Sequence, residues 1–299
     1  MVDYVASPLK TGPMPELPEV HALVADLDGR LRGRVVARLE LLSFAALKTF
    51  DPPVSAIDGQ RIRGITRHGK FLDFAIGDLH LVMHLARAGW VRWNDGTRPT
   101  PARPGKSPLA ARLILNDGTG LDVTEAGTKK SLAIYLVHQP ADVPSIARLG
   151  PDPLNDDFTE DRFQGILATA GRAQIKGVLR NQSTIAGIGN AYSDEILHVA
   201  RMSPFKPASM TADEAARLYD AMQATLREAI ARSEGLAASE LKKEKKSGMR
   251  VHGRTGEPCP ICGDTVRRVI YSDSTLQYCP TCQTGGKPLA DRVLSRLLK

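Results

Sequence analysis

The residues with the clearest chemical potential lie near the start of the chain, in the run Met14-Pro15-Glu16-Leu17-Pro18-Glu19-Val20. Proline lacks a backbone N–H and fixes φ, so this alternation suits neither a sheet nor a helix interior. If Met14 were the first residue and were removed, Pro15 would carry a free secondary amine with a pKa of about 8. Such an amine can attack a sugar C1′ to form an iminium, with Glu16 moving protons beside it. The alternative is a proline-rich helix entry whose glutamates favour the helix dipole.

A second chemical cluster is formed by the cysteines. All four, Cys259, Cys262, Cys279 and Cys282, fall in two Cys-x2-Cys pairs that are sixteen residues apart. In a cytosolic chain this spacing predicts one four-thiolate structural zinc site, with a β-hairpin between the pairs. Redox dithiols or two unrelated pairs are the alternatives. Because protein would fill all four positions, the predicted Zn²⁺ is structural and not catalytic.

A glycine-containing turn is the third candidate site. Gly187 and Gly189 lie between two helical stretches, immediately before Asn190. Two glycines let backbone amides point outward at a helix N-terminus, an arrangement that binds phosphate, and Asn190 could add a side-chain donor. The alternative is an ordinary turn in a helical hairpin.

Bulk properties restrict the class of protein. The chain has 299 residues, 42% of them apolar, and a net charge of +7. It is long enough for two or more domains, and its charge suits a polyanionic partner. No run is as long as a membrane helix, and residues 1–13 lack the features of a signal peptide. We therefore expect a cytoplasmic, nucleoid-associated monomer with no membrane partner.

Periodicity predicts an α+β multidomain fold. A helix is expected over His21–Leu31, followed by a β-sandwich whose short strands are separated by turns. The predicted strands are Val35–Leu42, Ile62–Arg67, Phe71–Ile76, Leu79–Leu85, Trp90–Trp93, Leu113–Leu115 and Gly120–Thr124. The predicted later helices are Asp161–Thr169, Ile175–Gln182, Ala191–Val199 and Ala212–Arg232. Ser239–Gly248 is expected to be a mobile basic loop.

These patterns give a division of the chain into six parts. They are an extension (1–13) absent from the mature protein, a catalytic β-sandwich domain (14–130), a linker (131–155), a helix–two-turn–helix DNA-binding domain (156–248), a zinc finger (249–285) and a basic tail (286–299).

Taken together, the motifs resemble one family. The Met14–Val20 run, Ala186-Gly187-Ile188-Gly189-Asn190 and the terminal cysteine hairpin occur in the order found in the formamidopyrimidine-DNA glycosylase / endonuclease VIII family of bifunctional base-excision repair enzymes. Further matches are Arg67-His68-Gly69-Lys70, Gly150-Pro151-Asp152-Pro153-Leu154, Ile175-Lys176 and the lead-in from Gly253 to Cys259. The resemblance spans Met14 to Gln283.

The resemblance implies a two-domain clamp on double-stranded damaged DNA and a role for each matching residue. Pro15 matches the N-terminal nucleophile, and Glu16 matches the general acid/base. Lys70 matches a lysine at a β-hairpin tip that contacts the phosphate beside the lesion. The implied phosphate contacts of the helical module are Lys176 and Asn190, together with Gly187 and Gly189. Arg254 falls in the lead-in to the zinc hairpin.

The chain departs from the formamidopyrimidine branch at positions that face the lesion. Arg87 stands where that branch has a methionine wedge, and Asp122–Gly127 lacks its arginine and phenylalanine. Ser274 replaces an arginine of the zinc hairpin, and the basic run Lys242–Lys246 replaces the loop that caps oxidised purines. Arg87 could serve as the wedge that holds the base stack open, with Trp90 as an alternative, although Trp90 and Trp93 are expected in the sandwich core.

We therefore predict a divergent zinc-finger DNA glycosylase with AP-lyase activity. A non-catalytic damaged-DNA binder, whose amine is blocked by the N-terminal extension, is the first alternative. A lyase that acts only on abasic sites is the second.

Overall fold

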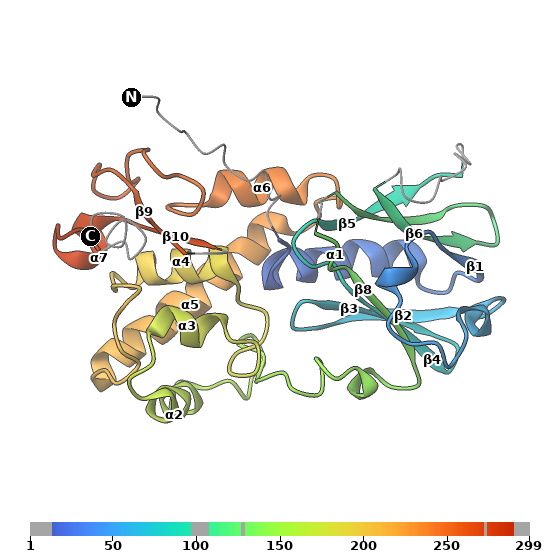
Figure 1. Cartoon of the computed structure of the whole chain (residues 1–299), viewed down its shortest axis with the longest axis horizontal. Helices are drawn as coiled ribbons and strands as arrows, with labels where there is room; N and C mark the ends of the chain where they lie inside the picture. The colour runs from blue at the N-terminus through green and yellow to red at the C-terminus, as the bar shows by residue number, and fades with distance from the viewer. Residues whose placement is uncertain (1–13, 97–107, 127–128, 272–273, 290–299) are drawn as a thin grey trace. The chain divides into compact units, whose positions relative to one another are not determined.

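The computed structural model describes residues 14–96, 108–126, 129–271 and 274–289, which fall into two compact units (Figure 1). The first unit comprises Leu27–Thr66 and Phe71–Val143, together with Pro15. The second comprises Glu16–Asp26, Arg67–Lys70 and the chain from Pro144 onward. The predicted extension and the end of the predicted basic tail lie outside the described residues.

Two four-stranded sheets form the first unit, which confirms the predicted β-sandwich. The first sheet has the order β1-β6-β7-β5 and the second has the order β2-β3-β4-β8. The strands of the first sheet are β1 (Val36–Leu41), β5 (Gly89–Asn94), β6 (Leu109–Leu115) and β7 (Gly120–Glu125). Those of the second are β2 (Ile62–His68), β3 (Phe71–Ile76), β4 (Leu79–His84) and β8 (Ala133–Val137). Short 3-10 turns occur at Phe44–Ala46, Val54–Ile57 and Pro140–Asp142.

Strand β8 differs from the prediction, because it lies inside the segment that was expected to be a linker. It pairs antiparallel with β4, with Leu136 opposite Leu81 and Ile134 opposite Met83. These four side chains are fully buried, so the segment is the edge of the core sheet. The alternation within only five residues gave too short a signal for the strand to be recognised from the sequence.

Helix α1 (Leu17–Leu31) begins four residues earlier than predicted. Pro18 lies in its first turn, where a missing N–H costs no hydrogen bond. The carboxylate of Glu19 accepts the backbone N–H of Glu16 at 2.8 Å. Leu23, Leu27 and Leu31 form the buried stripe. The helix N-terminus therefore accommodates Pro18.

The second unit is helical and ends in a β-hairpin. Its helices are α2 (Glu160–Ala170), α3 (Ile175–Arg180), α4 (Asn190–Val199), α5 (Ala212–Ser233), α6 (Leu241–Gly248) and α7 (Pro280–Thr284), and its strands are β9 (Arg267–Ile270) and β10 (Thr275–Tyr278). Helix α5 begins with the predicted capping box, in which Thr211 Oγ1 accepts from Glu214 N at 3.3 Å and Glu214 Oε2 accepts from Thr211 N at 3.2 Å. Its Leu218, Met222 and Leu226 pack into the main helical core.

Helix α6 replaces the mobile loop that was expected over Ser239–Gly248. Leu241 and Lys245, one turn apart, are its buried residues. Five residues of this helix are charged. Such a sequence predicts a solvent-exposed segment and does not reveal that one short face is buried. Among the described residues, no helix is both long and apolar enough to cross a membrane.

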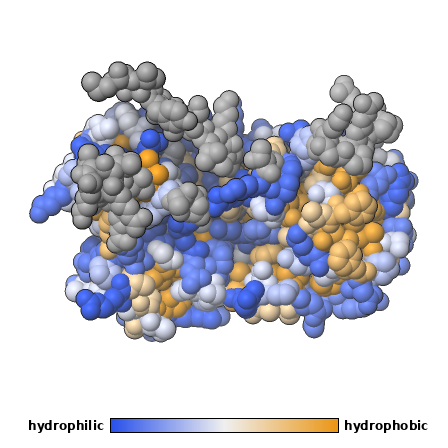
Figure 2. Space-filling model, viewed as in Figure 1, coloured by the Kyte–Doolittle hydropathy of each residue, from blue (hydrophilic) through white to orange (hydrophobic). Residues whose placement is uncertain are grey.

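The surfaces of the two units differ on the face drawn in Figure 2. Hydrophobic residues gather over part of the β-sandwich, whereas hydrophilic residues cover most of the helical unit. Phe44 and Phe50 of the sandwich are 79% and 77% exposed. Trp90 is buried, as expected for the core, and Trp93 is only half-buried, with the Arg30 guanidinium 5.6 Å from its ring centre.

Candidate active site and metal centre

Glu16 lies at the centre of the candidate active site. Pro15 is buried, and Glu16 is only 2% exposed. The Glu16 carboxylate accepts three backbone N–H groups from the start of α4: Gly189 at 2.7 Å, Ala191 at 2.9 Å and Tyr192 at 3.2 Å. A carboxylate in this position satisfies amides that the helix leaves unpaired and interacts favourably with the helix dipole.

The amides of the glycine turn, a predicted phosphate cradle, are bonded to side chains of the protein. Its Gly189 amide is bonded to Glu16, and the Gly187 amide donates to Gln182 Oε1 at 3.0 Å. A Cβ on Gly189 would lie 2.4 Å from the Glu16 carboxyl carbon, and one on Gly187 would lie 2.7 Å from Leu17 Cδ1. The glycines are needed because the start of α1 packs directly on this turn, and the protein's own carboxylate occupies the anion position.

Lys70 lies at the tip of the β2–β3 hairpin, as the prediction required. It follows Gly69, whose φ of +55° closes the turn, and it is only 8% exposed. A Cβ on Gly189 would be 2.7 Å from Lys70 Nζ, so the ammonium lies beside the Glu16 carboxylate. Burial lowers the pKa of Lys70, and the nearby charge of Glu16 opposes that shift.

A second lysine reaches the same carboxylates from α6. Lys245 Nζ lies 2.7 Å from Glu19 Oε2 and 4.0 Å from Glu16 Oε1. It also lies 5.0 Å from the ring centre of Tyr192, whose hydroxyl donates to Glu19 Oε1 at 2.6 Å. We call Glu16, Glu19, Lys70, Tyr192 and Lys245 the carboxylate cluster. Lys245 is a member that sequence reasoning missed.

The charges around Glu16 determine its protonation state. Burial alone would raise its pKa, but the positive charges of Lys245 and Lys70 and the N–H of Ala191 outweigh burial and lower the pKa to about 2. Glu16 is therefore a carboxylate at neutral pH. It can stabilise a cation or accept a proton, but it has no proton of its own to donate.

Lys176, a predicted phosphate contact, is bonded to groups of the protein. It is 5% exposed, and its Nζ is bonded to Asn190 O at 3.1 Å, Ser193 Oγ at 2.8 Å and Asp194 Oδ1 at 2.6 Å. An ammonium has three N–H donors, and all three are directed at protein acceptors. The residue joins α3 to α4 in this structure.

The other predicted DNA contacts occupy three different places. Asn190 donates Nδ2 to Thr275 O of β10 at 2.7 Å. Arg254 lies before the cysteine hairpin, with its Nε 2.8 Å from Glu257 Oε2. Arg87 is exposed in the turn between β4 and β5.

The four cysteines converge as the spacing predicted, at the ends of the β9–β10 hairpin. Cys262 Sγ lies 3.3 Å from Cys279 Sγ, and Cys259 Sγ lies 3.9 Å from Cys282 Sγ. Four thiolates about 2.3 Å from a tetrahedral Zn²⁺ would be about 3.8 Å apart, so the donor set fits such an ion.

A histidine also belongs to this centre. His198 near the end of α4 is buried, and its Nε2 lies 3.3 Å from Cys259 Sγ. The potential ligand atoms of His198, Cys259, Cys279 and Cys282 lie within 4.8 Å of one another. This group could hold a metal ion through three sulfurs and one imidazole, or, with Cys262 in place of His198, through four sulfurs. No local pattern pointed to His198, because it lies 61 positions from Cys259.

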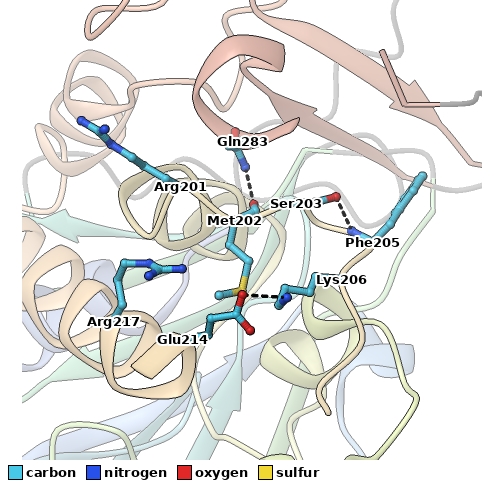
Figure 3. A pocket seen from close by; sticks show the side chains of 8 residues that line it. All are labelled: Arg201, Met202, Ser203, Phe205, Lys206, Glu214, Arg217 and Gln283. Atoms are coloured by element: carbon cyan, nitrogen blue, oxygen red, sulfur yellow. Dashed lines mark hydrogen bonds and ion pairs between the residues drawn. The ribbon is translucent and has the colours of Figure 1, made fainter. Parts of the chain in front are cut away.

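A separate cavity of about 420 Å³ lies where the turn after α4 meets α5 and α7 (Figure 3). Its wall carries the ion pair between Lys206 and Glu214, 2.9 Å apart. Gln283 Nε2 donates to Met202 O at 3.0 Å. The cavity shares no residue with the carboxylate cluster, and these interactions hold the turn in place.

Comparison with known proteins agrees with this geometry. Residues 14–128 match the formamidopyrimidine-DNA glycosylase N-terminal domain, and residues 149–240 match the H2TH domain of the same glycosylase. A formamidopyrimidine-DNA glycosylase of Symbiobacterium thermophilum is 34% identical over 281 residues, which cover 90% of this chain and 89% of that protein. An uncharacterised formamidopyrimidine-DNA glycosylase-like protein of Mycobacterium tuberculosis is 55% identical over 160 residues, covering 53% of this chain and 99% of its own length.

Solved structures give the same result. The MutM (Fpg) protein of Thermus thermophilus superposes with a TM-score of 0.76 at 32% identity, covering 92% of this chain and 100% of that one. The Fpg of Lactococcus lactis, in complex with DNA containing an abasic site, superposes with a TM-score of 0.78 at 27% identity, covering 90% and 99%. The sandwich, the helical module and the cysteine hairpin follow one another as in these relatives. The chain belongs to the formamidopyrimidine-DNA glycosylase family.

Proposed function

We propose that this protein is a DNA glycosylase with AP-lyase activity, acting as a cytoplasmic monomer on damaged double-stranded DNA. The observation that carries the proposal is the Glu16 carboxylate. Three amides of α4 hold it immediately after Pro15, with Lys70 beside it. The structures of relatives in complex with damaged DNA support the choice of partner.

In the proposed reaction, Pro15 is the mature N-terminus and its amine attacks C1′ of the damaged nucleotide. The N–C1′ bond forms as the glycosidic bond breaks, and the base leaves with the proton that the amine gives up. The C1′–O4′ bond of the sugar ring then breaks, O4′ takes a proton from solvent, and an iminium results. The iminium acidifies the C2′ hydrogen, so elimination expels the 3′ phosphate and breaks the strand. Glu16, held as a carboxylate, stabilises the positive nitrogen and accepts protons. Lys70 binds the phosphate beside the lesion.

The reaction needs a nucleotide that is turned out of the duplex, because C1′ cannot be approached within the base stack. Contacts to phosphates supply much of the affinity of such proteins and make binding dependent on salt. The net charge of +7 is consistent with a polyanionic partner. Arg87 on the exposed β4–β5 turn remains our candidate for the residue that fills the emptied stack.

Two forms of the protein test the role of Pro15. Protein that begins at Pro15 should be trapped covalently on abasic duplex DNA by borohydride. Protein that retains residues 1–13 should not be trapped, because its Pro15 nitrogen is an amide. Equal trapping of both forms would refute the assignment of Pro15. Tight binding of damaged DNA by the Pro15 form without any trapping would favour the non-catalytic binder.

We also propose that the cysteine centre holds one structural Zn²⁺ through Cys259, Cys262, Cys279 and Cys282. His198 would then donate a hydrogen bond to the Cys259 thiolate, as residues around metal ligands commonly do. Cys279→Ser should lose the metal and weaken DNA binding, because bound zinc stabilises the folded hairpin.

Paired variants identify the fourth ligand. With four thiolate ligands, Cys262→Ser should lose the zinc, whereas His198→Asn should keep one ion per chain. The reverse result would establish three sulfurs and one imidazole. Metal content measured by mass spectrometry distinguishes these outcomes.

A further inference from the structure

Helix α6 places one lysine in the carboxylate cluster and keeps others in solvent. Lys243 and Lys246 are exposed, whereas Lys245 is 5% exposed. A buried lysine is costly unless its charge is paired. Its burial beside two carboxylates therefore indicates a specific placement and not a general basic surface.

The helix is fixed by contacts of its own. Glu244, the residue before Lys245, accepts from Arg232 Nε of α5 at 2.6 Å. Leu241, one turn earlier, is fully buried. These two contacts fix the rotation of α6 about its axis, so Lys245 faces inward.

The partners of Lys245 share a surplus of negative charge. Glu16 and Glu19 lie at the start of α1 and are each almost fully buried. Lys70 approaches from the β2–β3 turn, and Lys245 lies 2.7 Å from Glu19 and 4.0 Å from Glu16. Without Lys245, two buried carboxylates would face one lysine.

Other titratable groups face Glu16 from the remaining elements. Tyr192 contributes a neutral hydroxyl from α4, which is bonded to Glu19. His252 adds a weaker favourable interaction from the segment after α6. Lys176 of α3 is paired with Asp194. Lys245 is therefore the cation that most directly balances the second carboxylate.

We propose that Lys245 is a positioning residue of the active site, which holds the Glu19 and Glu16 side chains in place at the start of α1, directly after Pro15 in the chain. This inference rests on the proposed function. Glu19 is fixed by direct contact, and Glu16 by charge. Because Lys245 belongs to α6, the carboxylate cluster is complete only when this helix is packed in the position seen here. Lysine suits the position because its small ammonium group can bond Glu19 and lie over the Tyr192 ring.

The direct test measures the titration of Glu16 by carbon-13 NMR, in protein labelled at the glutamate carboxyl groups. The Glu16 signal is assigned by its absence in Glu16→Gln. Lys245→Met should raise the Glu16 pKa by about one unit or more, the usual effect of removing a cation within 4–6 Å. Lys246→Met removes the same charge from an exposed position on the same helix and should leave Glu16 unchanged.

The second test measures elimination at a preformed abasic site under single-turnover conditions, in protein that begins at Pro15. Lys245→Met should slow the reaction by about tenfold or more, the scale expected for loss of a charge placed for the transition state. Lys245→Arg should recover most of the rate, and Lys246→Met should retain it.

A stability control is needed because Lys245→Met leaves Glu19 buried without its cation. Lys245→Met combined with Glu19→Gln removes both charges and should restore thermal stability, whereas the pKa of Glu16 should stay raised. Unchanged Glu16 titration in Lys245→Met, or equal effects of Lys245→Met and Lys246→Met, would overturn the proposal. If wild-type protein fails to react with abasic DNA, the proposed function is wrong, and the titration still decides whether Lys245 sets the state of Glu16.

Discussion

Two buried glutamates, one bonded to the start of α4 and one within α4, have similar hydrogen bonds but pKa values shifted in opposite directions. Glu16 and Glu195 are each 2% exposed. Glu16 accepts from the amides of Gly189, Ala191 and Tyr192. The Glu195 carboxylate accepts from the backbone N–H groups of Arg250 at 2.7 Å, Val251 at 2.9 Å and His252 at 2.8 Å. The pKa of Glu16 is lowered to about 2, whereas burial raises the pKa of Glu195 despite its three amide donors.

The difference lies in the charged neighbours. Lys245 and Lys70 lower the pKa of Glu16, whereas the charge that acts on Glu195 is the like charge of Asp194, which raises its pKa. Three backbone donors therefore do not outweigh burial by themselves, and two cations do. Glu195 joins α4 to the segment before the cysteine hairpin. Glu16 has a similar set of amide bonds, and the added cations keep it ionised at the site of the proposed chemistry.

The largest expected effect separates the two glutamates by activity. Glu16→Gln should slow elimination at an abasic site by about 10³-fold, a loss of about 4 kcal/mol of transition-state stabilisation, because the group that accepts protons is removed. Glu195→Gln, provided that the protein remains folded, should change this rate far less. Single-turnover kinetics at neutral pH measure both variants. Comparable losses in the two would show that Glu16 acts only through the fold.

The next effect concerns Lys176, a cation that binds Asp194 and not Glu195. Lys176→Met leaves a fully buried Asp194 with His252 as its remaining side-chain partner. Breaking a buried ion pair in this way should destabilise the protein by about 3 kcal/mol in urea unfolding. The salt dependence of DNA binding should stay the same, whereas loss of a phosphate contact would flatten its slope by about one unit. A flattened slope without loss of stability would support the predicted phosphate contact of Lys176.

Local patterns in the sequence were enough to predict most elements of this fold. The period-two strands, the Thr211 capping box and the cysteine spacing each depend on residues that are close in the chain. The position of Lys70 in a hairpin turn was instead implied by the family resemblance. Five-residue β8 gave too little alternation, and the apolar stripe used to predict α1 did not include its first four residues.

The partners of the site could not be predicted in the same way. The carboxylate cluster joins Glu16 to amides 173 to 176 positions away and Glu19 to Lys245, 226 positions away. The glycine turn has the composition of a phosphate site, and nothing local shows that a carboxylate of the same chain fills it. Lys245 looks solvated in a run of charges, and His198 looks like a core residue. Their roles depend on tertiary packing.

The pH dependence of stability should show the lowered pKa of Glu16. Its folded pKa of about 2 lies below the unfolded value of 4.5, so its contribution is present above pH 4.5 and is lost as the pH falls toward 2. Between neutral pH and about pH 3.5, wild type should lose about 1.4 kcal/mol of unfolding free energy relative to Glu16→Gln. Denaturant unfolding at several pH values measures this difference. A constant difference would mean that Glu16 is not held as an anion in the folded state.

Glu195 should give a smaller effect of opposite sign. Its folded pKa lies above the unfolded value of 4.5, because burial and the charge of Asp194 favour the protonated form. The stabilisation it provides is therefore complete below pH 4.5 and is lost as the pH rises through the folded pKa. Relative to Glu195→Gln, wild type should become less stable as the pH rises from 4 to 7. Relative to Glu16→Gln, wild type should instead become more stable as the pH rises from about 3.5 to neutral. Carbon-13 titration of the carboxyl groups provides an independent check, with the Glu195 signal moving above pH 4.5 and the Glu16 signal well below it. If both carboxyl groups titrate below 4.5, the amide donors alone are sufficient to hold a buried glutamate ionised, and Lys245 is not required for the state of Glu16.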